Sequence, residues 1–300
     1  NGRLNRLYLA YDRTRTVPRF DAAFVVDEKS QSLVAQPTDS AWHFLSYQRY
    51  DMYRSGTSFG LFTQKDLEEG RIPDAKVVFL LNPFRLSADQ AAKIRAAAEK
   101  DGKTLVFSYG FGETDPAVVA SLTGMTLRRT DTRASVRLSR TAAAAEFGLG
   151  NKTSFGADVQ ATPRWVVDAG ADAVLGTYTS GGGAGFAVRD NGGYKVVFFG
   201  GMRMDADVLR AIYRYAGAHV FLDSDDVVQA NDDLLVVHAS RAGTKTLRFP
   251  RKVDVYDYFL GQWHLGVTQV QVGMSEAETR YFFYGTRSAI EARGLPAWPK

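Results

Sequence analysis

The stretch AKVVFLLNPFRLSADQAAKIRAAAEKDGKTLVFSYG, residues 75–110, decides the fold. Its opening run KVVFLL is apolar without alternation, which is typical of a strand covered on both faces. Ser87 and Gln90 have the spacing of a capping box, so a helix is expected to begin there. Gly102 is expected to end it, because glycine tolerates the left-handed conformation. The closing KTLVFSY is a second apolar strand, and the three elements predict a right-handed crossover in a parallel sheet.

The same alternation extends outward from this stretch. Strands are expected at 21–27, 58–62, 174–178, 185–189 and 194–199, and helices at 42–53, 115–124 and 205–217. Residues 131–164 are polar and rich in Ala, Thr and Gly, so they are expected to run across the surface. From 226 to 284 strands alternate with turns and no helix is predicted.

The elements predict two domains. An α/β domain is expected at 21–221, and a small antiparallel β-sandwich is expected at 222–285. Residues 1–20 are interpreted as an N-terminal linker and 286–300 as a tail. The side chains expected inside the sandwich are those of Val236, Leu247, Val253, Val255, Val270 and Phe282.

Composition limits the partners. The chain has 300 residues, 45% of them apolar, and a formal net charge of +4 with interspersed signs. A nucleic-acid partner is therefore not expected. No apolar run reaches the roughly 18 residues of a membrane span, so no membrane partner is expected either. The absence of cysteine excludes disulfides and a thiolate nucleophile, and slightly favours a periplasmic or extracellular location over a cytoplasmic one. The opening Asn1-Gly2 reads as the interior of a longer protein, so we expect a mature or excised fragment.

A resemblance to a known family rests on LLVVHASRAGTKTLRFPRKVDVYDYFLG, residues 234–261, and on the segments before it. These are YKVVFFGG at 194–201, LRAIYRYAGA at 209–218 and VVQA at 227–230. Together with the strands and helix of 21–110, their order resembles the trimerisation domain and C-terminal β domain that follow the catalytic barrel in family 42 β-galactosidases. The likeness covers about residues 21 to 284.

The resemblance implies a class I glutamine-amidotransferase-like, flavodoxin-like fold, a parallel sheet with helices on both faces. It also implies a non-catalytic accessory region that packs against a catalytic barrel absent from this chain, and a homo-oligomer, specifically a trimer. No catalytic residue is carried over, because the catalytic glutamates of that family lie in the barrel. Apolar side chains in 42–62 and near Phe84 and Phe111 are the expected contact surface.

An alternative is a free-standing hydrolase of amidotransferase fold. It would use Ser108 or Glu113, which lie at and just after the end of the 103–109 strand, where open α/β sheets place ligands. Ser108 lacks the G-x-S-x-G frame of a nucleophile elbow. In the competing interpretation, Ser108 only ends the strand with its hydroxyl bonded to the backbone. Glu113 then lies in a solvated loop or caps a helix.

A second alternative is a carbohydrate-binding protein. Its sugar-stacking platform would be the aromatic set Trp42, Phe44, Tyr47, Tyr50, Tyr53, Phe59 and Phe62. At near-helical spacing such residues also pack a helix onto a sheet. Tyr50, Asp51 and Arg54 are expected to point outward beside a cleft and to contact a ligand.

No metal and no cofactor are expected. The histidines are scattered, without metal-ligand spacing, at His43, His219, His238 and His264. The glycine-rich run at 181–185 is followed by an expected strand, so it lacks the helix N-terminus that holds a phosphate.

Overall fold

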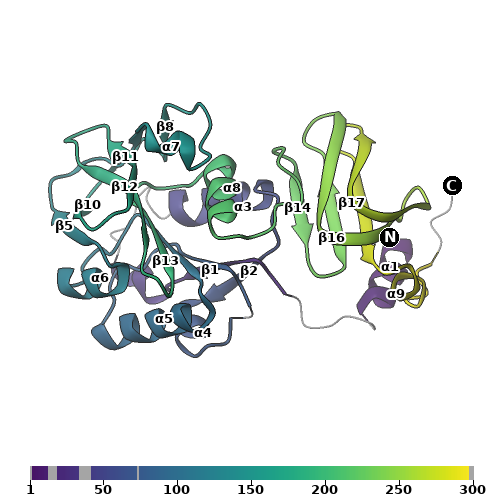
Figure 1. Cartoon of the computed structure of the whole chain (residues 1–300), viewed down its shortest axis with the longest axis horizontal. Coiled ribbons are helices and arrows are strands. Elements are labelled where there is room, and N and C mark those ends of the chain that lie inside the picture. Colours follow the sequence, from purple (N-terminus) through teal and green to yellow (C-terminus); the bar gives the residue numbers. More distant parts are fainter. Residues whose placement is uncertain (1, 13–18, 34–41, 73, 297–300) are drawn as a thin grey trace. The chain divides into compact units, whose positions relative to one another are not determined.

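The computed structural model describes residues 2–12, 19–33, 42–72 and 74–296. The chain forms two compact units (Figure 1). The α/β unit contains residues 21–52 and 60–218, and the β unit contains residues 1–20, 53–59 and 219–300. The chain therefore visits the β unit three times.

The core of the α/β unit is a parallel sheet. Its strands are β1 (Ala22–Val26), β3 (Val77–Leu80), β4 (Thr104–Ser108) and β13 (Lys195–Phe199), with β2 (Phe59–Thr63) beside β1. β1 pairs with β3, β3 with β4 and β4 with β13, all in parallel register. The order β2-β1-β3-β4-β13 matches the flavodoxin-like order 2-1-3-4-5.

The crossover predicted between β3 and β4 is confirmed. Helix α5 (Ala88–Asp101) begins after Ser87, whose hydroxyl accepts a hydrogen bond from the Gln90 backbone N–H at 3.2 Å. The Gln90 side chain accepts one from the Ser87 N–H at 3.0 Å. Gly102 ends the helix with φ 62°. The capping residues predicted from spacing alone are therefore the ones that bound this helix.

Helices cover both faces of the parallel sheet (Figure 1). On one face, Ile94 of α5 lies in the same buried cluster as Val78 and Leu80 of β3. On the other, the ring of Phe79 contacts Tyr213 of α8 (Ala206–Tyr215) at a centroid distance of 5.7 Å. Because successive residues of β3 are buried on opposite sides, its uninterrupted apolar run is explained.

The other half of the sheet is antiparallel. Beyond β13 lie β12 (Ala184–Asp190), β11 (Ala173–Tyr178), β7 (Leu138–Arg140) and β8 (Ser154–Phe155), and β10 (Arg164–Ala169) pairs with β12 and with β5 (Thr126–Thr130). A separate ribbon joins β6 (Ala134–Ser135) to β9 (Gln160–Ala161). The sheet is thus mixed, and parallel only in its first half.

The expectation that residues 131–164 run across the surface is wrong. β7 and β8 extend the main sheet, and Leu138 and Phe155 are fully buried. Strands of two or three residues are too short to show a period of two in the sequence.

The remaining helical elements are η1 (Lys29–Leu33), the π-helix η2 (Trp42–Tyr47), α3 (Gln48–Arg54), α4 (Gln64–Glu68), α6 (Pro116–Thr123) and α7 (Ala143–Glu146).

The β unit is one five-stranded antiparallel sheet rather than the expected sandwich of two sheets. Its order is β14 (Val227–Ala230), β15 (Leu234–His238), β18 (Thr279–Gly285), β16 (Gly243–Asp257) and β17 (Gln262–Met274). β16 is 15 residues long and its register with β17 shifts between Arg248 and Val253. Pro250 lies in this interval, and such an irregularity bends a strand.

Five of the six side chains expected inside this unit are buried, and Val236 is the exception. Leu235 and Val237 point into the core in its place. Because side chains alternate along a strand, an error of one residue moves the prediction to the opposite face.

Two terminal helices pack against a second cluster of residues of this sheet. Residues 1–20 were expected to be a linker and 286–300 a tail, but α1 (Gly2–Asp12) and α9 (Arg287–Glu291) are helices. Leu7 and Ile290 lie in one buried cluster with Tyr258 and Phe283 of the sheet region. None of the helices in the described part of the chain is long and apolar enough to span a membrane.

Candidate functional site

A turn with left-handed backbone conformations follows β4 in the α/β unit. Ser108 ends the strand, and Tyr109 then adopts φ 64°, a left-handed conformation that non-glycine residues rarely take. The Tyr109 N–H donates to the Phe199 carbonyl of β13 at 2.8 Å, which holds the turn against the neighbouring strand. Gly110 and Gly112 are also left-handed, with φ 113° and 44°. The chain therefore turns sharply at the carboxyl ends of the central strands, where ligands of open α/β sheets bind.

Ser108 lies at this turn but without the partners of a nucleophile. Its side chain is 0% exposed, and its hydroxyl has no hydrogen-bond partner within the described ranges. A serine nucleophile needs a base within hydrogen-bond distance. The residue in the strained conformation is Tyr109, one position later.

Glu113 belongs to an exposed group of charges. Its carboxylate lies 2.7 Å from the Arg129 guanidinium, which also contacts Asp131 at 2.8 Å. The hydrogen bond that Arg129 donates to Glu113 is the main cause of the raised pKa of Arg129. The structure therefore joins Glu113 to a surface ion-pair group.

The residue that sequence reasoning missed is Arg164. It is the first residue of β10, is only 5% exposed, and its Nη1 donates to the carbonyls of Ser135 at 3.1 Å and Ser180 at 2.8 Å. Its guanidinium lies over the ring of Tyr178, 4.9 Å from the centroid. Arg164 is the last residue of 131–164, the segment that was expected to run across the surface. The apolar residues that follow it, Trp165 to Val167, are the signal that could have placed it in a strand.

Two buried tyrosines, Tyr178 and Tyr109, lie near Arg164. The Tyr178 hydroxyl donates to the carbonyl of Trp165 at 2.8 Å and lies 3.3 Å from that of Gly200, just after β13. Burial raises the pKa of Tyr178, and the Arg164 charge opposes the rise. The same two effects act on the pKa of Tyr109. Both phenols therefore stay protonated and neutral at physiological pH.

Helix α3 fixes the loop after β13. The Gln48 amide donates to the Met204 carbonyl and accepts from the Met204 N–H, both at 2.7 Å. Asp51, one helical turn on, accepts from Nε of Arg203 at 2.7 Å. This hydrogen bond is the main cause of the raised pKa of Arg203. Asp51 was expected to point outward, but it is only 6% exposed because it anchors this loop.

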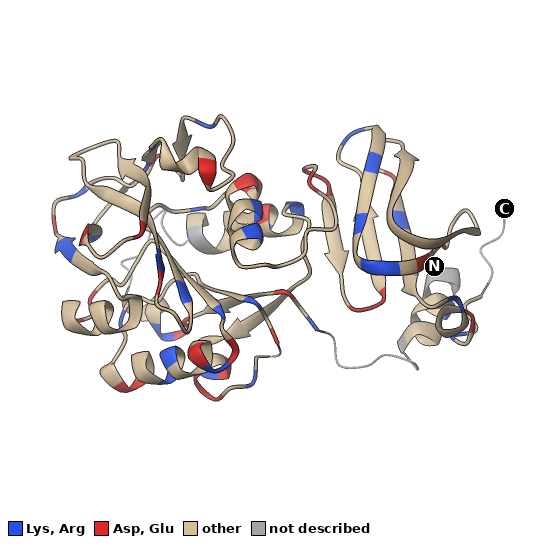
Figure 2. Ribbon diagram, viewed as in Figure 1, with Lys and Arg blue, Asp and Glu red and all other residues tan. Residues whose placement is uncertain are grey.

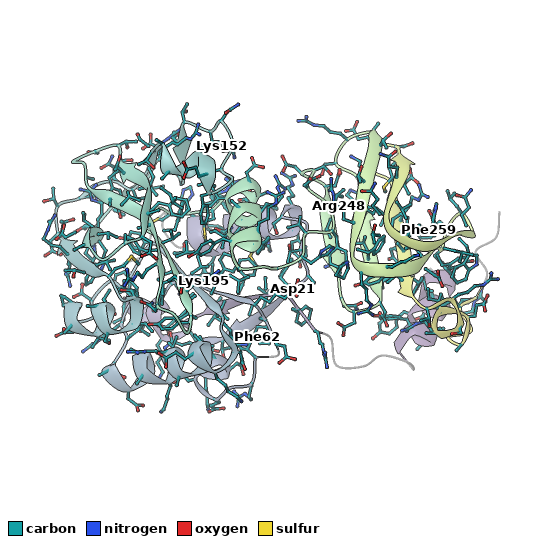
Figure 3. All side chains as sticks on the ribbon, in the orientation of Figure 1. Asp21, Phe62, Lys152, Lys195, Arg248 and Phe259 are labelled. Atoms are coloured by element: carbon teal, nitrogen blue, oxygen red, sulfur yellow. The ribbon has the colours of Figure 1, made fainter. Side chains whose placement is uncertain are left out.

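The aromatic set is divided by the fold. Trp42, Tyr47 and Tyr50 are 58%, 41% and 50% exposed. Phe62, labelled in Figure 3, packs against the core cluster of the α/β unit. Tyr53 and Phe59 contact each other in the β unit.

The remaining predicted contact residues have different environments. The side chain of Phe44 lies outside the described residues. Arg54 is exposed. Phe84 is partly buried. Phe111, expected at a contact surface, is 0% exposed because it packs on Phe107 and Trp165.

The glycine-rich turn between β11 and β12 lies beside Arg164. Gly181, Gly182 and Gly183 all have left-handed φ angles, 78°, 66° and 85°. Strand β12 follows rather than a helix, as expected. In the ranges that the structure describes, no three His, Asp or Glu side chains converge as metal ligands would. Figure 2 shows both signs of charge spread over each unit.

The two units define a mixed α/β protein with a separate antiparallel sheet. Several solved structures that are similar to this chain are β-galactosidases. The enzyme from Bacillus circulans sp. alkalophilus superposes with a TM-score of 0.67 at 14% identity, over 93% of this chain and 43% of that one. Gan42B, a GH42 β-galactosidase, superposes with a TM-score of 0.60 at 12% identity, over 88% of this chain and 40% of Gan42B. The enzyme from Halorubrum lacusprofundi superposes with a TM-score of 0.58 at 13% identity, over 94% of this chain and 42% of that enzyme.

These likenesses confirm the expected resemblance for the fold. The chain spans less than half of the length of each of these enzymes. No protein-family profile matches the sequence, and no curated protein is significantly similar to it.

Proposed function

We propose that this chain is the non-catalytic accessory region of a β-galactosidase-like glycoside hydrolase, and that it packs against a catalytic barrel that it does not contain. The observation that carries the proposal is the unequal coverage. The match takes in 93% of this chain but only 43% of the Bacillus enzyme. The site supports it as well, because the Ser108 hydroxyl has no hydrogen-bond partner among the described residues and Glu113 is bound in a surface ion pair. In this proposal the α/β unit is amidotransferase-like and has lost its chemistry, with Tyr109 at the sharp turn.

The gene provides the direct test. A barrel-coding sequence in frame and immediately upstream of Asn1 is the expected result, and an upstream stop codon would exclude the proposal. The purified chain should hydrolyse neither aryl galactosides nor glutamine. Turnover that disappears in Ser108→Ala or Glu113→Gln would favour the free-standing hydrolase instead.

We propose in addition that the accessory role includes self-association, as a trimer by the family resemblance. The exposed apolar side chains that support it lie close in sequence, at Trp42, Tyr47, Tyr50 and Leu61, the last 63% exposed. A stable interface buries about 800 Å² on each partner, and a few such aromatic anchors supply most of its energy. Sedimentation equilibrium at micromolar concentration should show the oligomer. Trp42→Ser combined with Leu61→Ser should dissociate it, and a wild-type monomer would refute this role.

Carbohydrate binding is a second candidate, favoured by the same exposed rings. The Trp42 and Tyr47 rings are 6.2 Å apart, and the Arg49 guanidinium lies 5.2 Å from the centre of the Tyr50 ring. A titration with galactose and lactose, read by tryptophan fluorescence, tests it. Trp42→Ala should abolish the response, and Trp263→Phe, a change in the β unit, should keep it. The absence of a saturable response in the wild-type chain would exclude this candidate.

A further inference from the structure

Arg164 differs from every other buried basic side chain among the described residues. Five basic residues are at most 7% exposed, and four of them have a carboxylate within salt-bridge distance. The four pairs are Lys103–Asp101, Arg210–Asp207, Lys245–Asp226 and Arg280–Asp257. In the described part of the chain, Arg164 forms no salt bridge. Taking a charge out of water without a counter-charge is expensive, so this exception requires an explanation.

The unoccupied part of the guanidinium is one defined edge. Nη1 donates to two backbone carbonyls, at 3.1 and 2.8 Å. Nε is buried without a partner, and within the described residues Nη2 has no hydrogen bond either. In a guanidinium, the Nε–H and one N–H of Nη2 point the same way and form a planar fork. This fork matches the two oxygens of a carboxylate.

The fork lies where the fold places ligands. The Tyr178 ring under the guanidinium is held by the carbonyl groups that follow β13 and begin β10. Gly110, the residue after Tyr109 in the sharp turn after β4, lies beside Trp165 of β10, because a Cβ atom at Gly110 would lie 3.2 Å from the Trp165 ring. The site is therefore at the carboxyl ends of β4 and β13, the usual position of ligands in open α/β sheets.

Gly181 lies close to the Nη2 end of the fork. A Cβ atom at Gly181 would lie 3.1 Å from Nη2 of Arg164, whereas one at Gly182 would meet nothing within 4 Å. Both glycines are left-handed, so a side chain at either position carries a similar backbone strain.

We propose that the Nε–Nη2 edge of Arg164 binds the carboxylate of a small ligand, beside Tyr109 and the Gly181 turn. A carboxylate would supply the counter-charge that the other buried basic residues have. This binding site does not depend on the accessory role, and it requires no catalytic step.

The arginine Nε–H signals of the ¹⁵N-labelled full chain give a direct reading. The signal that is absent from the spectrum of Arg164→Lys identifies this group. Titration with galacturonate or acetate should shift that signal saturably, and neutral galactose should leave it unchanged. A signal that responds to neither carboxylate would overturn the proposal. A response to inorganic phosphate alone would overturn the carboxylate assignment.

The two glycines provide a matched pair that leaves Arg164 intact. Gly181→Ala should weaken binding of galacturonate about tenfold or more, because a charge-assisted hydrogen bond would be hindered. Gly182→Ala should bind as the wild type does. Equal affinity in all three proteins, or equal weakening in both variants, would contradict a site beside Nη2. Circular dichroism spectra of both variants should first match that of the wild type.

Discussion

The buried ion pair of the β unit makes a quantitative prediction. Asp226 and Lys245 are 2% and 7% exposed, and the Lys245 ammonium lies 2.8 and 3.0 Å from the two Asp226 oxygens. The carboxylate also accepts from the Ser240 N–H at 2.7 Å and the Ser224 hydroxyl at 2.6 Å. Lys245→Met would leave a buried carboxylate without its counter-charge, which typically costs about 3–5 kcal/mol. Because the two other hydrogen bonds remain, we expect a loss of about 3 kcal/mol in the free energy of unfolding of this unit.

The sign of the pH dependence follows from the Asp226 pKa. Burial raises this pKa, but the hydrogen bonds from Lys245, Ser224 and Ser240 outweigh burial and hold it below its ordinary value of 3.8. In the wild type, this carboxylate therefore adds stability above pH 3.8 that is lost as the pH falls through the lowered pKa. Lys245→Met leaves burial dominant, so the Asp226 pKa should rise above its ordinary value. Protonation then relieves the buried charge, and the difference from the wild type should shrink as the pH falls from 7 to about 4.

Hydrogen exchange in increasing urea, read by mass spectrometry on peptides of the β unit, separates its unfolding from that of the α/β unit. Lys252→Met is the matched control, since Lys252 is an exposed lysine of the same strand, β16. The control should change stability by less than about 0.5 kcal/mol. A loss below about 1 kcal/mol in Lys245→Met, or a loss independent of pH, would refute the reasoning.

Three further predictions concern single residues. Tyr11→Phe removes a hydroxyl that is hydrogen-bonded to the loop before β15. It should lower the free energy of unfolding of the β unit by about 1–2 kcal/mol and speed amide hydrogen exchange in α1. The pKa of Tyr11 is raised to about 12, mainly by burial, so no loss of this contact should appear up to pH 10, as absorbance at 295 nm can check. Gly56→Ala should cost about 3 kcal/mol or more in thermal unfolding, because its Cβ would lie 1.8 Å from the Leu222 carbonyl oxygen. Gly261 is also left-handed, but the nearest atom to its Cβ would be the Tyr256 hydroxyl oxygen at 3.9 Å, an ordinary contact. Gly261→Ala should therefore lower the free energy of unfolding by only about 1 kcal/mol, and equal losses would contradict the steric explanation. Ser108→Ala should leave the free energy of unfolding, measured in urea, unchanged or raise it by about 1 kcal/mol, because the buried hydroxyl has no partner among the described residues. A decrease of more than about 1 kcal/mol would contradict this and would indicate a hydrogen bond from Ser108.

The crossover of 75–110 could be predicted because its signals are local. An apolar run, a capping pair three residues apart and a glycine at the helix end each report on their own neighbourhood. The same holds for the turn at Gly192, where β12 and β13 meet. The error at Val236 marks the limit of this reasoning, since nothing nearby distinguishes the two registers of its strand.

The candidate site depends on contacts between distant parts of the chain. Ser135 and Ser180 come to Arg164 from elements 29 and 16 residues away. Asp51 meets Arg203 across 152 residues. A pattern in one segment cannot show which polar side chain will be buried by another segment. For that reason Asp51 was expected outside and Arg164 was not considered.

The division of the β unit among three parts of the sequence has a consequence for its synthesis. Its last strand, β18, lies between β15 and β16 in the middle of the sheet. Residues 1–20 and 53–59 therefore cannot complete the β unit until β18 has been synthesised. At 5–20 residues per second, β18 leaves the ribosome on the order of ten seconds or more after residue 59. The α/β unit is complete at residue 218 and can fold during that interval. A premature stop before β18 should leave a folded α/β unit with unprotected, protease-sensitive segments on either side of residues 21–52.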